Sequence, residues 1–312
     1  MKVLVTGPFG NVGGHPLPEL RRQGHEVRAV ARLSTANRKA AKAHDVEVVW
    51  GDITDPAAVA RAADGVHTVI HLAAVIPPTS DEQPDWARKV NVDGTANVIA
   101  ACQAAGARLL FASTMDVHGY TIDRPPPRHI DDPLVGTDPY SNHKIEGEAS
   151  VRASGLDWSI LRLADVPILG IRDPHPIMFE IGLHNRIETM HADDAGLALT
   201  NALAVDEVWG RTLFVGGGPR CQITYREYVS KILGAMGIAM LPDEAFSDKP
   251  YATDWLDTEE SEARLRYQRY SFDDIAEQIA ASLGWKRRFA SAAAPMARSA
   301  ILRLSPYYRA AR

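Results

Sequence analysis

A glycine-rich stretch directly behind the first hydrophobic segment restricts the fold of this 312-residue chain more than any other feature. Residues 3–5 are typical of a buried strand, and the sequence TGPFGNVG follows at 6–13, ahead of a predicted helix. Glycines at 7, 10 and 13 allow a tight turn, the approach of a pyrophosphate to the backbone, and close packing of helix on strand. The helix N-terminus then offers free N–H groups to phosphates. A glycine turn without a ligand is the alternative, but its place after the first strand favours a dinucleotide site.

Short β-branched segments alternate with longer helical patterns in the first half of the chain. The segments lie at 3–5, 27–31, 46–50, 68–72, 109–112 and 158–161. Helices are predicted between them, for example at 17–23 and 86–105, each followed by a glycine that can adopt the left-handed conformation. This alternation predicts an α/β fold, a Rossmann-type doubly wound parallel sheet with a smaller C-terminal substrate-binding part. Pro16 and Pro18 predict a late or distorted start of the first helix, because proline fits only a first helical turn.

Prolines and glycines cluster after Val166, where we place the change of domain. Residues 1–165 are predicted to form the NAD(P)-binding Rossmann domain, and 186–218 to return to it through a strand at 208–215. Residues 166–185 and 219–285 are predicted to form the substrate-binding part, with helices at 225–236 and 272–283. Residues 286–312 form a basic tail.

Composition excludes several classes of function. The net charge of −5 gives no electrostatic footprint for nucleic acid, and no apolar segment reaches membrane-spanning length. No basic and then apolar leader follows Met1, so a cytoplasmic protein without a signal peptide is expected. Cys102 and Cys221 are too few for a disulfide framework and lack the spacing of a metal site, so no metal is expected.

The tail from 286 to 312 differs from the rest in charge. It has no acidic residue, and its basic residues are Lys286, Arg287, Arg288, Arg298, Arg303, Arg309 and Arg312. We expect a solvated tail or one that contacts another subunit. The alternative is a short surface helix that touches anionic lipid and is confined by Pro295 and Pro306.

The end of the second predicted strand bears on the choice of cofactor. An acidic residue there binds the ribose hydroxyls of NAD, whereas arginine accepts the 2′-phosphate of NADP. The chain has Arg32 at this point, with Arg38 and Lys39 close behind, so a guanidinium contact to phosphate is available. We predict NADP as the cofactor and keep NAD as the alternative, in which Arg32 is simply solvated.

A tyrosine and a lysine with helical spacing predict a catalytic pair. Tyr140 and Lys144 lie four residues apart and share one helical face. An ammonium group near a phenol is expected to lower its pKa toward working pH, which makes tyrosine a usable acid or base. Ser113 and Thr114 end the fifth strand, and ligands of parallel sheets bind beyond the carboxyl ends of the strands. A hydroxyl there can hold a substrate oxygen beside Tyr140.

Together these features resemble the extended short-chain dehydrogenase/reductases, which include nucleotide-sugar epimerases and dehydratases, dihydroflavonol-type reductases and 3β-hydroxysteroid dehydrogenases. The resemblance covers residues 1–285. Its markers, in order, are TGPFGNVG at 6–13, GDITD at 51–55, HLAA at 71–74, NVDGT at 91–95, ST at 113–114 ahead of VHG at 117–119, YSNHK at 140–144, LR at 161–162 and HADD at 191–194.

The resemblance implies roles for single residues. Asp52 would contact adenine, Lys144 would bind the nicotinamide ribose and tune Tyr140, and Asn91 would support the active-site helix and its proton path. The implied catalytic set is Thr114, Tyr140, Lys144, Asn91 and Ser113, with Thr114 aligning better than Ser113. The implied cofactor-binding residues are Gly7, Phe9, Gly10, Asn11, Val12, Gly13, Arg32, Asp52, Ile53, Leu72, Ala73, Ala74, Tyr140, Lys144 and Val166.

Some of these residues also have a purely structural interpretation. Asp52 could cap the end of a strand, and Asn91 could be a buried structural amide. His71, His118 and His191 lack the spacing of metal ligands, so we interpret all three as structural.

Two departures from the family pattern bear on the substrate. The chain reads Arg162-Leu163-Ala164-Asp165 where members usually have Arg-Pro-x-Asn, which questions the contacts at the nicotinamide end. The segment 166–191 is also shorter than in enzymes that act on sugar nucleotides, so a smaller or more apolar small-molecule substrate is expected.

Three functions follow from the sequence. The first is an NAD(P)-dependent oxidoreductase that interconverts a ketone and a secondary alcohol. The alternatives are an epimerase or dehydratase with tightly bound NAD, and a non-catalytic NADP-binding protein. The resemblance also suggests a homodimer formed by the helices at 86–105 and 141–154.

Overall fold

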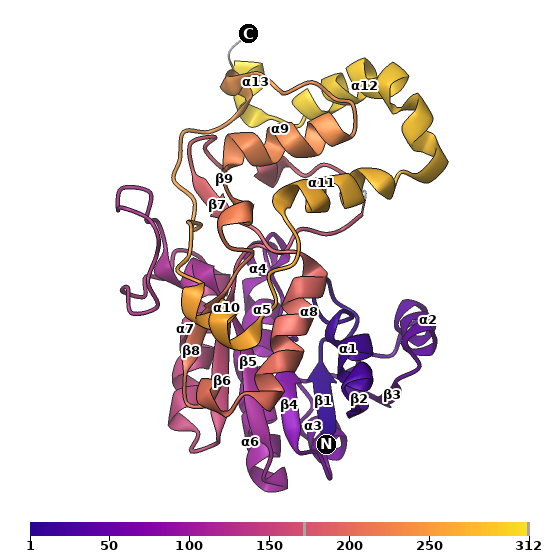
Figure 1. Cartoon of the computed structure of the whole chain (residues 1–312), viewed down its shortest axis with the longest axis vertical. Helices are drawn as coiled ribbons and strands as arrows, with labels where there is room; N and C mark the ends of the chain where they lie inside the picture. Colours follow the sequence, from indigo (N-terminus) through magenta and orange to yellow (C-terminus); the bar gives the residue numbers. More distant parts are fainter. Residues whose placement is uncertain (171–172, 311–312) are drawn as a thin grey trace.

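A parallel sheet forms the centre of the molecule (Figure 1). The computed structural model describes residues 1–170 and 173–310, apart from the side chains of 286–293 and 309–310. Within these residues seven parallel strands follow the order β3-β2-β1-β4-β5-β6-β8. They are β1 (Lys2–Thr6), β2 (Glu26–Ala31), β3 (Glu47–Trp50), β4 (Thr68–His71), β5 (Arg108–Thr114), β6 (Trp158–Leu163) and β8 (Thr212–Val215). The predicted doubly wound fold is confirmed, and its strand order reverses between β1 and β4, where such sheets bind ligands.

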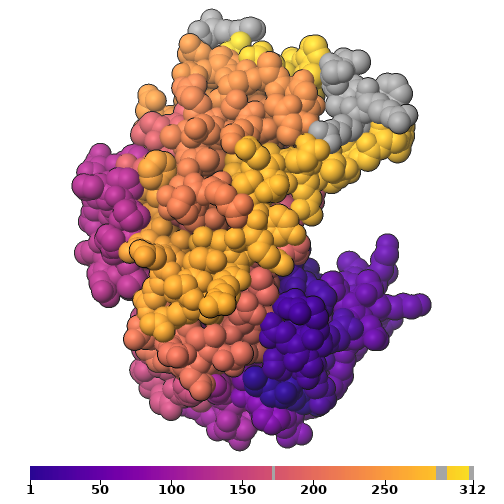
Figure 2. Space-filling view, viewed as in Figure 1, coloured from indigo at the N-terminus to yellow at the C-terminus, as the bar shows by residue number. Residues whose placement is uncertain are grey.

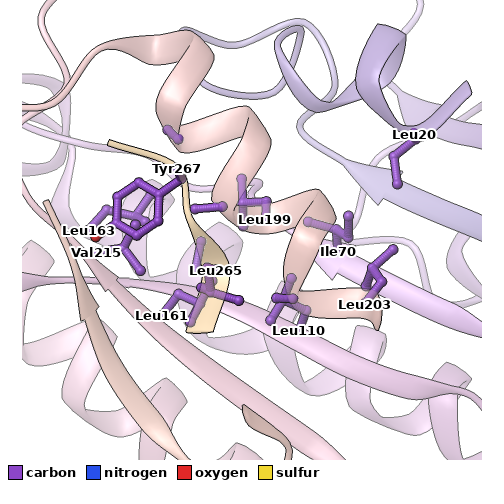
Figure 3. Packing of buried hydrophobic residues seen from close by; sticks show 14 of the residues in the cluster. Leu20, Ile70, Leu110, Leu161, Leu163, Leu199, Leu203, Val215, Leu265 and Tyr267 are labelled. Atoms are coloured by element: carbon purple, nitrogen blue, oxygen red, sulfur yellow. The ribbon is translucent and has the colours of Figure 1, made fainter. Parts of the chain in front are cut away.

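Helices cover both faces of the sheet. Before the C-terminal part these are α1 (Pro16–Arg22), α2 (Thr35–His44), α3 (Pro56–Ala63), α4 (Thr79–Glu82), α5 (Pro84–Arg88), α6 (Gly94–Ala105), α7 (Pro139–Ala153) and α8 (Ala192–Asn201). Residues alternate between the faces along each strand, so Leu110 packs with α1 and α8, whereas Leu109 packs with α3, α6 and α7. Figure 3 shows the first of these cores, in which Leu199 of α8 and Leu203 of the helical turn after it lie against Ile70, Leu110 and Leu161 of the sheet. Burial on both faces explains why the strands are apolar throughout.

The helix predicted at 86–105 is interrupted. Helix α5 ends at Arg88, a wide π-type turn spans Lys89–Asp93, and α6 begins at Gly94. The turn brings the side chain of Asn91 inward, where its amide donates to the carbonyl of Val75 at 2.8 Å and accepts from the Val75 N–H at 2.7 Å. Such turns occur mostly where a side chain must be placed for a specific purpose.

Two other boundaries test the predictions, and one of them differs. The strand predicted at 208–215 begins only at Thr212, because Asp206–Val208 forms a helical turn and Gly210 follows with a φ of 75°. The predicted late start of the first helix is confirmed, because α1 begins only at Pro16, and both prolines lie in the first turn, where their missing N–H groups are not needed.

The C-terminal part lies beyond the carboxyl ends of the strands (Figure 1). It contains the antiparallel pair β7 (Arg186–Glu188) and β9 (Gln222–Thr224). Its helices are α9 (Tyr225–Ala235), α11 (Phe272–Ala281), α12 (Arg287–Leu302) and α13 (Pro306–Ala310), whereas α10 (Glu259–Leu265) packs beside β8 of the sheet. A hydrophobic core of its own joins α9, α11 and α12, and Phe179 and Phe272 are fully buried in it.

The basic tail packs on this core and is therefore not a simply solvated segment. Ile301 and Leu302 are buried, Tyr307 donates to Glu180 at 2.6 Å, and Ser305 donates to the carbonyl of Ala245 at 2.6 Å. Helix α12 also continues through Pro295, which was expected to end it. Side chains of Arg298 and Arg303 are described, whereas Lys286, Arg287, Arg288, Arg309 and Arg312 lie outside the described side chains. None of the helices in the described part of the chain is long and apolar enough to span a bilayer.

The docking of α12 can be tested with two substitutions in the same helix. Ile301 is 8% exposed and Met296 is 79% exposed. We expect Ile301→Ala to lower the free energy of unfolding by about 2–4 kcal/mol, because a buried side chain of this size leaves a cavity. Met296→Ala should change it by less than about 0.5 kcal/mol. Urea unfolding measures both values, and equal small effects would show that the tail is not docked.

Candidate active site

The glycine turn between β1 and α1 is held in one shape by its own backbone. Gly7 has a φ of 65°, and a Cβ on it would lie 2.8 Å from the nitrogen of Ala73. A Cβ on Gly13 would lie 1.9 Å from the carbonyl oxygen of Gly7, so both positions require glycine. Gly10 differs, because the nearest atom to a Cβ there is the Gly7 oxygen at 3.5 Å. The chain itself therefore leaves room at Gly10, which fits the close approach of a phosphate to the backbone.

A buried chain of hydrogen bonds connects this turn to the end of β4. The hydroxyl of Thr6 accepts from the N–H groups of Leu72 and Ala73, each at 3.1 Å, and lies 2.7 Å from Nδ1 of His71. Burial lowers the pKa of His71 to about 3, so the ring is neutral. Because the Thr6 oxygen already accepts twice, its proton goes to Nδ1, and Nε2–H of His71 donates to Thr95 at 3.0 Å.

Thr95 extends the chain to the π-type turn. Its hydroxyl donates to the backbone carbonyl of Asn91 at 2.7 Å. Asn91 therefore supports the segment that follows β4 through its amide and its carbonyl, and its side chain bonds to Val75 rather than to Lys144. The structural interpretations of Asn91 and His71 both match this geometry. Thr6 and Thr95 were not singled out from the sequence, since no local pattern indicates their partners.

Helix α7 presents Tyr140 and Lys144 at the carboxyl edge of the sheet. Asp138 caps its N-terminus by accepting from the N–H of Ser141 at 2.7 Å, and Pro139 occupies the first turn. Gly147 lets the helix approach β5, since a Cβ there would lie 3.0 Å from the Phe111 ring. The ammonium of Lys144 donates to the carbonyl of Ala112 at 2.6 Å.

The side chain of Thr114, at the end of β5, lies close to the side chains of Tyr140 and Asp116. Its oxygen also accepts from the N–H of Asp116 at 3.2 Å. Ser113 points to the other face of the sheet and lies beside Glu148, so the structure brings Thr114 and not Ser113 to Tyr140. This placement agrees with the better alignment of Thr114.

The expected lowering of the Tyr140 pKa is not found. Burial of the phenol, together with the charges of Asp116 and Asp138, raises the pKa of Tyr140. The Lys144 nitrogen lies 5.8 Å from the centre of the Tyr140 ring and bonds to a carbonyl elsewhere, so it does not offset burial. Burial also lowers the pKa of Lys144 to about 8. Tyr140 is consequently a protonated donor at neutral pH.

A buried ion pair fixes α7 against β6. Arg162 donates to both carboxylate oxygens of Glu148, at 2.9 and 2.7 Å, and neither side chain is exposed by more than 3%. Arg162 also donates to Nε2 of His118 at 3.0 Å, so His118 is neutral, and its pKa is lowered to about 4 mainly by burial. Glu148 lies one turn beyond Lys144, and this spacing could have identified it in the sequence.

Near the ends of β2 and β3, the guanidinium of Arg32 is accessible to solvent. The side chain of Arg32 is 70% exposed and its Nε lies 4.0 Å from Oδ2 of Asp52. Oδ1 of Asp52 accepts from the N–H and the hydroxyl of Thr54, each at 2.9 Å, which is the cap that the alternative interpretation predicted. Ile53 lies nearby against Gly94 of α6.

Other predicted cofactor residues lie around the glycine turn. The side chain of Asn11 donates to the carbonyl of Val166 at 2.7 Å, which joins the turn to the segment after β6. Leu72, Ala73 and Ala74 continue β4 beside Thr6. Phe9 and Val12 are partly buried against the core that contains α1 and α8. Within the described residues, no group of three or more His, Cys, Asp or Glu side chains could hold a metal ion.

The surface is deeply hollowed beside this site. Figure 2 shows the hollow between the indigo and purple N-terminal region and the orange and yellow C-terminal part. The carboxyl ends of the strands face the C-terminal part, so the glycine turn, Thr114 and Tyr140 lie on this side of the sheet. A long ligand that spans the switch point can reach all three.

Comparison with curated proteins identifies relatives over most of the chain. The family model described as "NAD dependent epimerase/dehydratase family" matches residues 3–170. A 2-alkyl-3-oxoalkanoate reductase of Stenotrophomonas maltophilia is 31% identical over 271 residues, which are 80% of this chain and 79% of that protein. A 3 beta-hydroxysteroid dehydrogenase/Delta 5-->4-isomerase of Mycobacterium tuberculosis is 38% identical over 123 residues, which are 37% of this chain and 32% of that protein.

Solved structures with the same fold include enzymes of sugar nucleotides. A UDP-glucose 4-epimerase from Thermotoga maritima has a TM-score of 0.78 at 20% identity, covering 91% of this chain and 98% of that one. The dTDP-glucose 4,6-dehydratase DesIV from Streptomyces venezuelae, determined with NAD bound, has a TM-score of 0.78 at 25% identity and covers 93% and 98%.

Two neighbouring glycines test the shape of the turn. Gly13→Ala places a Cβ against the carbonyl of Gly7, so the turn must open, and we expect the dissociation constant for NADPH to rise at least about tenfold, or roughly 1.4 kcal/mol. Gly14→Ala is the matched control, because its Cβ comes no closer than 3.4 Å, to His44. Nucleotide fluorescence titration measures both constants, with thermal unfolding to confirm folding. Wild-type affinity in the Gly13 variant would contradict this role of the turn.

Proposed function

The chain belongs to the NAD-dependent epimerase/dehydratase family, the extended short-chain dehydrogenase/reductases, and we propose that within it the protein reduces a ketone to a secondary alcohol, or the reverse, on a small or apolar substrate. The observation that carries the proposal is the proximity of the Thr114 and Tyr140 side chains on the same edge of the sheet as the glycine turn. Both relatives described above are named for chemistry at a carbonyl or secondary alcohol.

The residues of the turn fit a nicotinamide dinucleotide. Gly10 leaves space where a diphosphate approaches, and the N-terminus of α1 favours negative charge. When bound, the dinucleotide supplies the hydride acceptor or donor. In this proposal Gly7, Gly10 and Gly13 shape the diphosphate site, and Lys144 lies at the ribose end.

Tyr140 and Thr114 divide the remaining chemistry. The raised pKa keeps the phenol protonated, so Tyr140 gives its proton to the substrate oxygen as that oxygen gains charge, and takes it back in the reverse direction. Thr114 holds the same oxygen by a hydrogen bond and so sets its orientation toward Tyr140. Lys144 is fixed by the Ala112 carbonyl and adds positive charge below the ring of Tyr140.

Arg32 supports NADP as the preferred cofactor. Its guanidinium is exposed at the end of β2 and is 4.0 Å from a single carboxylate oxygen, so it retains donors for a 2′-phosphate. NAD remains the alternative, and it accompanies the second candidate function, an epimerase or dehydratase, which the likeness to DesIV favours. The absorbance of the purified protein separates the two: NAD that survives dialysis supports the epimerase, whereas exchangeable binding supports the reductase.

Removal of the phenolic hydroxyl tests the proton donor. We expect Tyr140→Phe to lower kcat for a ketone at least about 100-fold, the contribution of a positioned general acid. Its affinity for NADPH should stay within about twofold of wild type, because the diphosphate site is elsewhere. Tyr120→Phe is the control, since Tyr120 is 54% exposed. NADPH oxidation with methyl esters of 2-alkyl-3-oxoalkanoates provides the assay, and undiminished kcat in the Tyr140 variant would exclude the role.

The choice of cofactor has its own test. Arg32→Ala should raise the dissociation constant for NADPH at least about tenfold, since a hydrogen bond to a charged group contributes about 1.5–3 kcal/mol. The constant for NADH should not change. Arg61→Ala on α3 is the control for lost positive charge, because Arg61 is exposed near the other end of the sheet. If Arg32→Ala weakened the binding of NADPH and NADH equally, or changed neither dissociation constant, recognition of the 2′-phosphate by Arg32 would be contradicted.

A further inference from the structure

The C-terminal tail, residues 286–312, differs in charge from the rest of the chain. It contains seven of the 34 basic residues and none of the 39 acidic ones, so residues 1–285 hold 27 basic and 39 acidic residues. The chain as a whole has a net charge of −5. A basic segment on an acidic protein is attracted to a negatively charged surface, over a range of about 8 Å at physiological ionic strength.

One face of α12 attaches the tail to the C-terminal part, at the end of the molecule far from the sheet (Figure 1). Ala294, Ile301 and Leu302 are buried in the core of that part. Arg298 donates to the carbonyl of Met240 from Nε at 3.3 Å and from Nη2 at 3.0 Å, so its side chain also faces the protein. These contacts fix the orientation of α12, and with it the direction of the remaining side chains.

The opposite face of α12 is exposed. Met296, Ala300 and Arg303 follow one another at intervals of four and three residues, which places them on one side of the helix, and all three are exposed. The exposed fraction is 79% for Met296 and 36% for Leu304, which follows the helix. These four residues form the outward face of the tail. It combines apolar side chains with a cation.

Residues at both ends of α12 add to this combination. Trp285 lies in the helical turn Gly284–Lys286, directly before α12, and is 72% exposed. Tryptophan is enriched where proteins meet the headgroup region of a bilayer, and clusters of lysine and arginine bind anionic lipids. The sequence places further basic residues before and after the outward face, namely Lys286, Arg287, Arg288, Arg309 and Arg312.

Two acidic side chains beside the tail already have cationic partners. Glu180 lies 3.5 Å from the ammonium of Lys249, and Asp243, in the helical turn that packs on α13, pairs with Arg226 at 2.6 Å. Glu244 of the same turn is exposed and opposes the basic charge at that point. Because the tail itself has no carboxylate, its excess of positive charge is retained.

We propose that the outward face of the tail binds the surface of a membrane that contains anionic lipid. Met296 and Leu304 enter the boundary between headgroups and acyl chains, and Arg303 contacts lipid phosphates. The helix lies along the membrane and does not cross it. A purely anionic partner would engage the cations and leave Met296 and Leu304 in water, which is why the combination favours lipid. The inference does not depend on the reaction proposed above.

Vesicle flotation of the full chain tests the inference. Vesicles of phosphatidylcholine are compared with vesicles of equal parts phosphatidylcholine and phosphatidylglycerol. We expect at least about tenfold tighter binding to the anionic vesicles, and weaker binding to them as salt is added. Arg303→Glu should weaken this binding at least about tenfold, because it changes two units of charge and each contributes about fivefold. Met296→Ser should weaken it about threefold or more, because less apolar surface enters the bilayer.

Matched controls carry the same changes away from the tail. Arg61→Glu on α3 and Ile76→Ser after β4 alter exposed residues, and both should keep wild-type binding, with thermal unfolding to confirm that each variant is folded. Equal binding to neutral and anionic vesicles, or wild-type binding by Arg303→Glu, would overturn the inference. A dimer that sedimentation detects in the wild type and that Met296→Ser dissociates would also overturn it, because the outward face would then be a contact between subunits.

Discussion

The contact between Gly7 and Gly13 is the constraint on which the site depends. A Cβ on Gly13 would meet the carbonyl oxygen of Gly7, and a Cβ on Gly7 would meet the backbone of Ala73, so no side chain fits at either position. Thr6, immediately before the turn, joins it by hydrogen bonds to the end of β4, and the buried chain through His71 and Thr95 carries that connection to Asn91. Because each group in this chain both donates and accepts, a change at one member leaves a buried polar atom without its partner. The shape of the turn is thereby coupled to the loop that borders the cleft.

A second rigid unit positions the chemistry. The buried pair of Glu148 and Arg162 fixes α7 against β6, and the cap at Asp138 sets where the helix starts. Tyr140 lies in the first turn of this helix, so its distance from Thr114 follows from two anchored elements rather than from a flexible loop. Removing one partner of a buried ion pair lowers the free energy of unfolding by more than the intact pair adds to it, because the remaining charge stays buried without its partner. The arrangement holds a phenol and a hydroxyl together in advance of substrate.

The sheet and the glycine turn were predictable because they depend on local signals. Apolar strands, glycines after helices and the spacing of Tyr140 and Lys144 act over short stretches. The π-type turn was not predictable, because the Asn91 side chain bonds to the backbone N–H and carbonyl of Val75, which lies 16 residues earlier in the sequence. The docking of the tail was not predicted, because burial of Ile301 and Leu302 outweighs the weak helix propensity at Pro295. The pKa of Tyr140 is raised rather than lowered because the phenol is buried. The spacing of residues in the sequence gives no information on burial.

The central claim is that the edge formed by the glycine turn, Thr114 and Tyr140 is a nicotinamide dinucleotide site. Isothermal titration calorimetry of the full chain with NADPH and with NADH tests it most directly. The account predicts one site per chain with tighter binding of NADPH, and competition between the two nucleotides for it. If neither nucleotide produces saturable heat with the folded protein, the assigned site and the chemistry built on it are wrong.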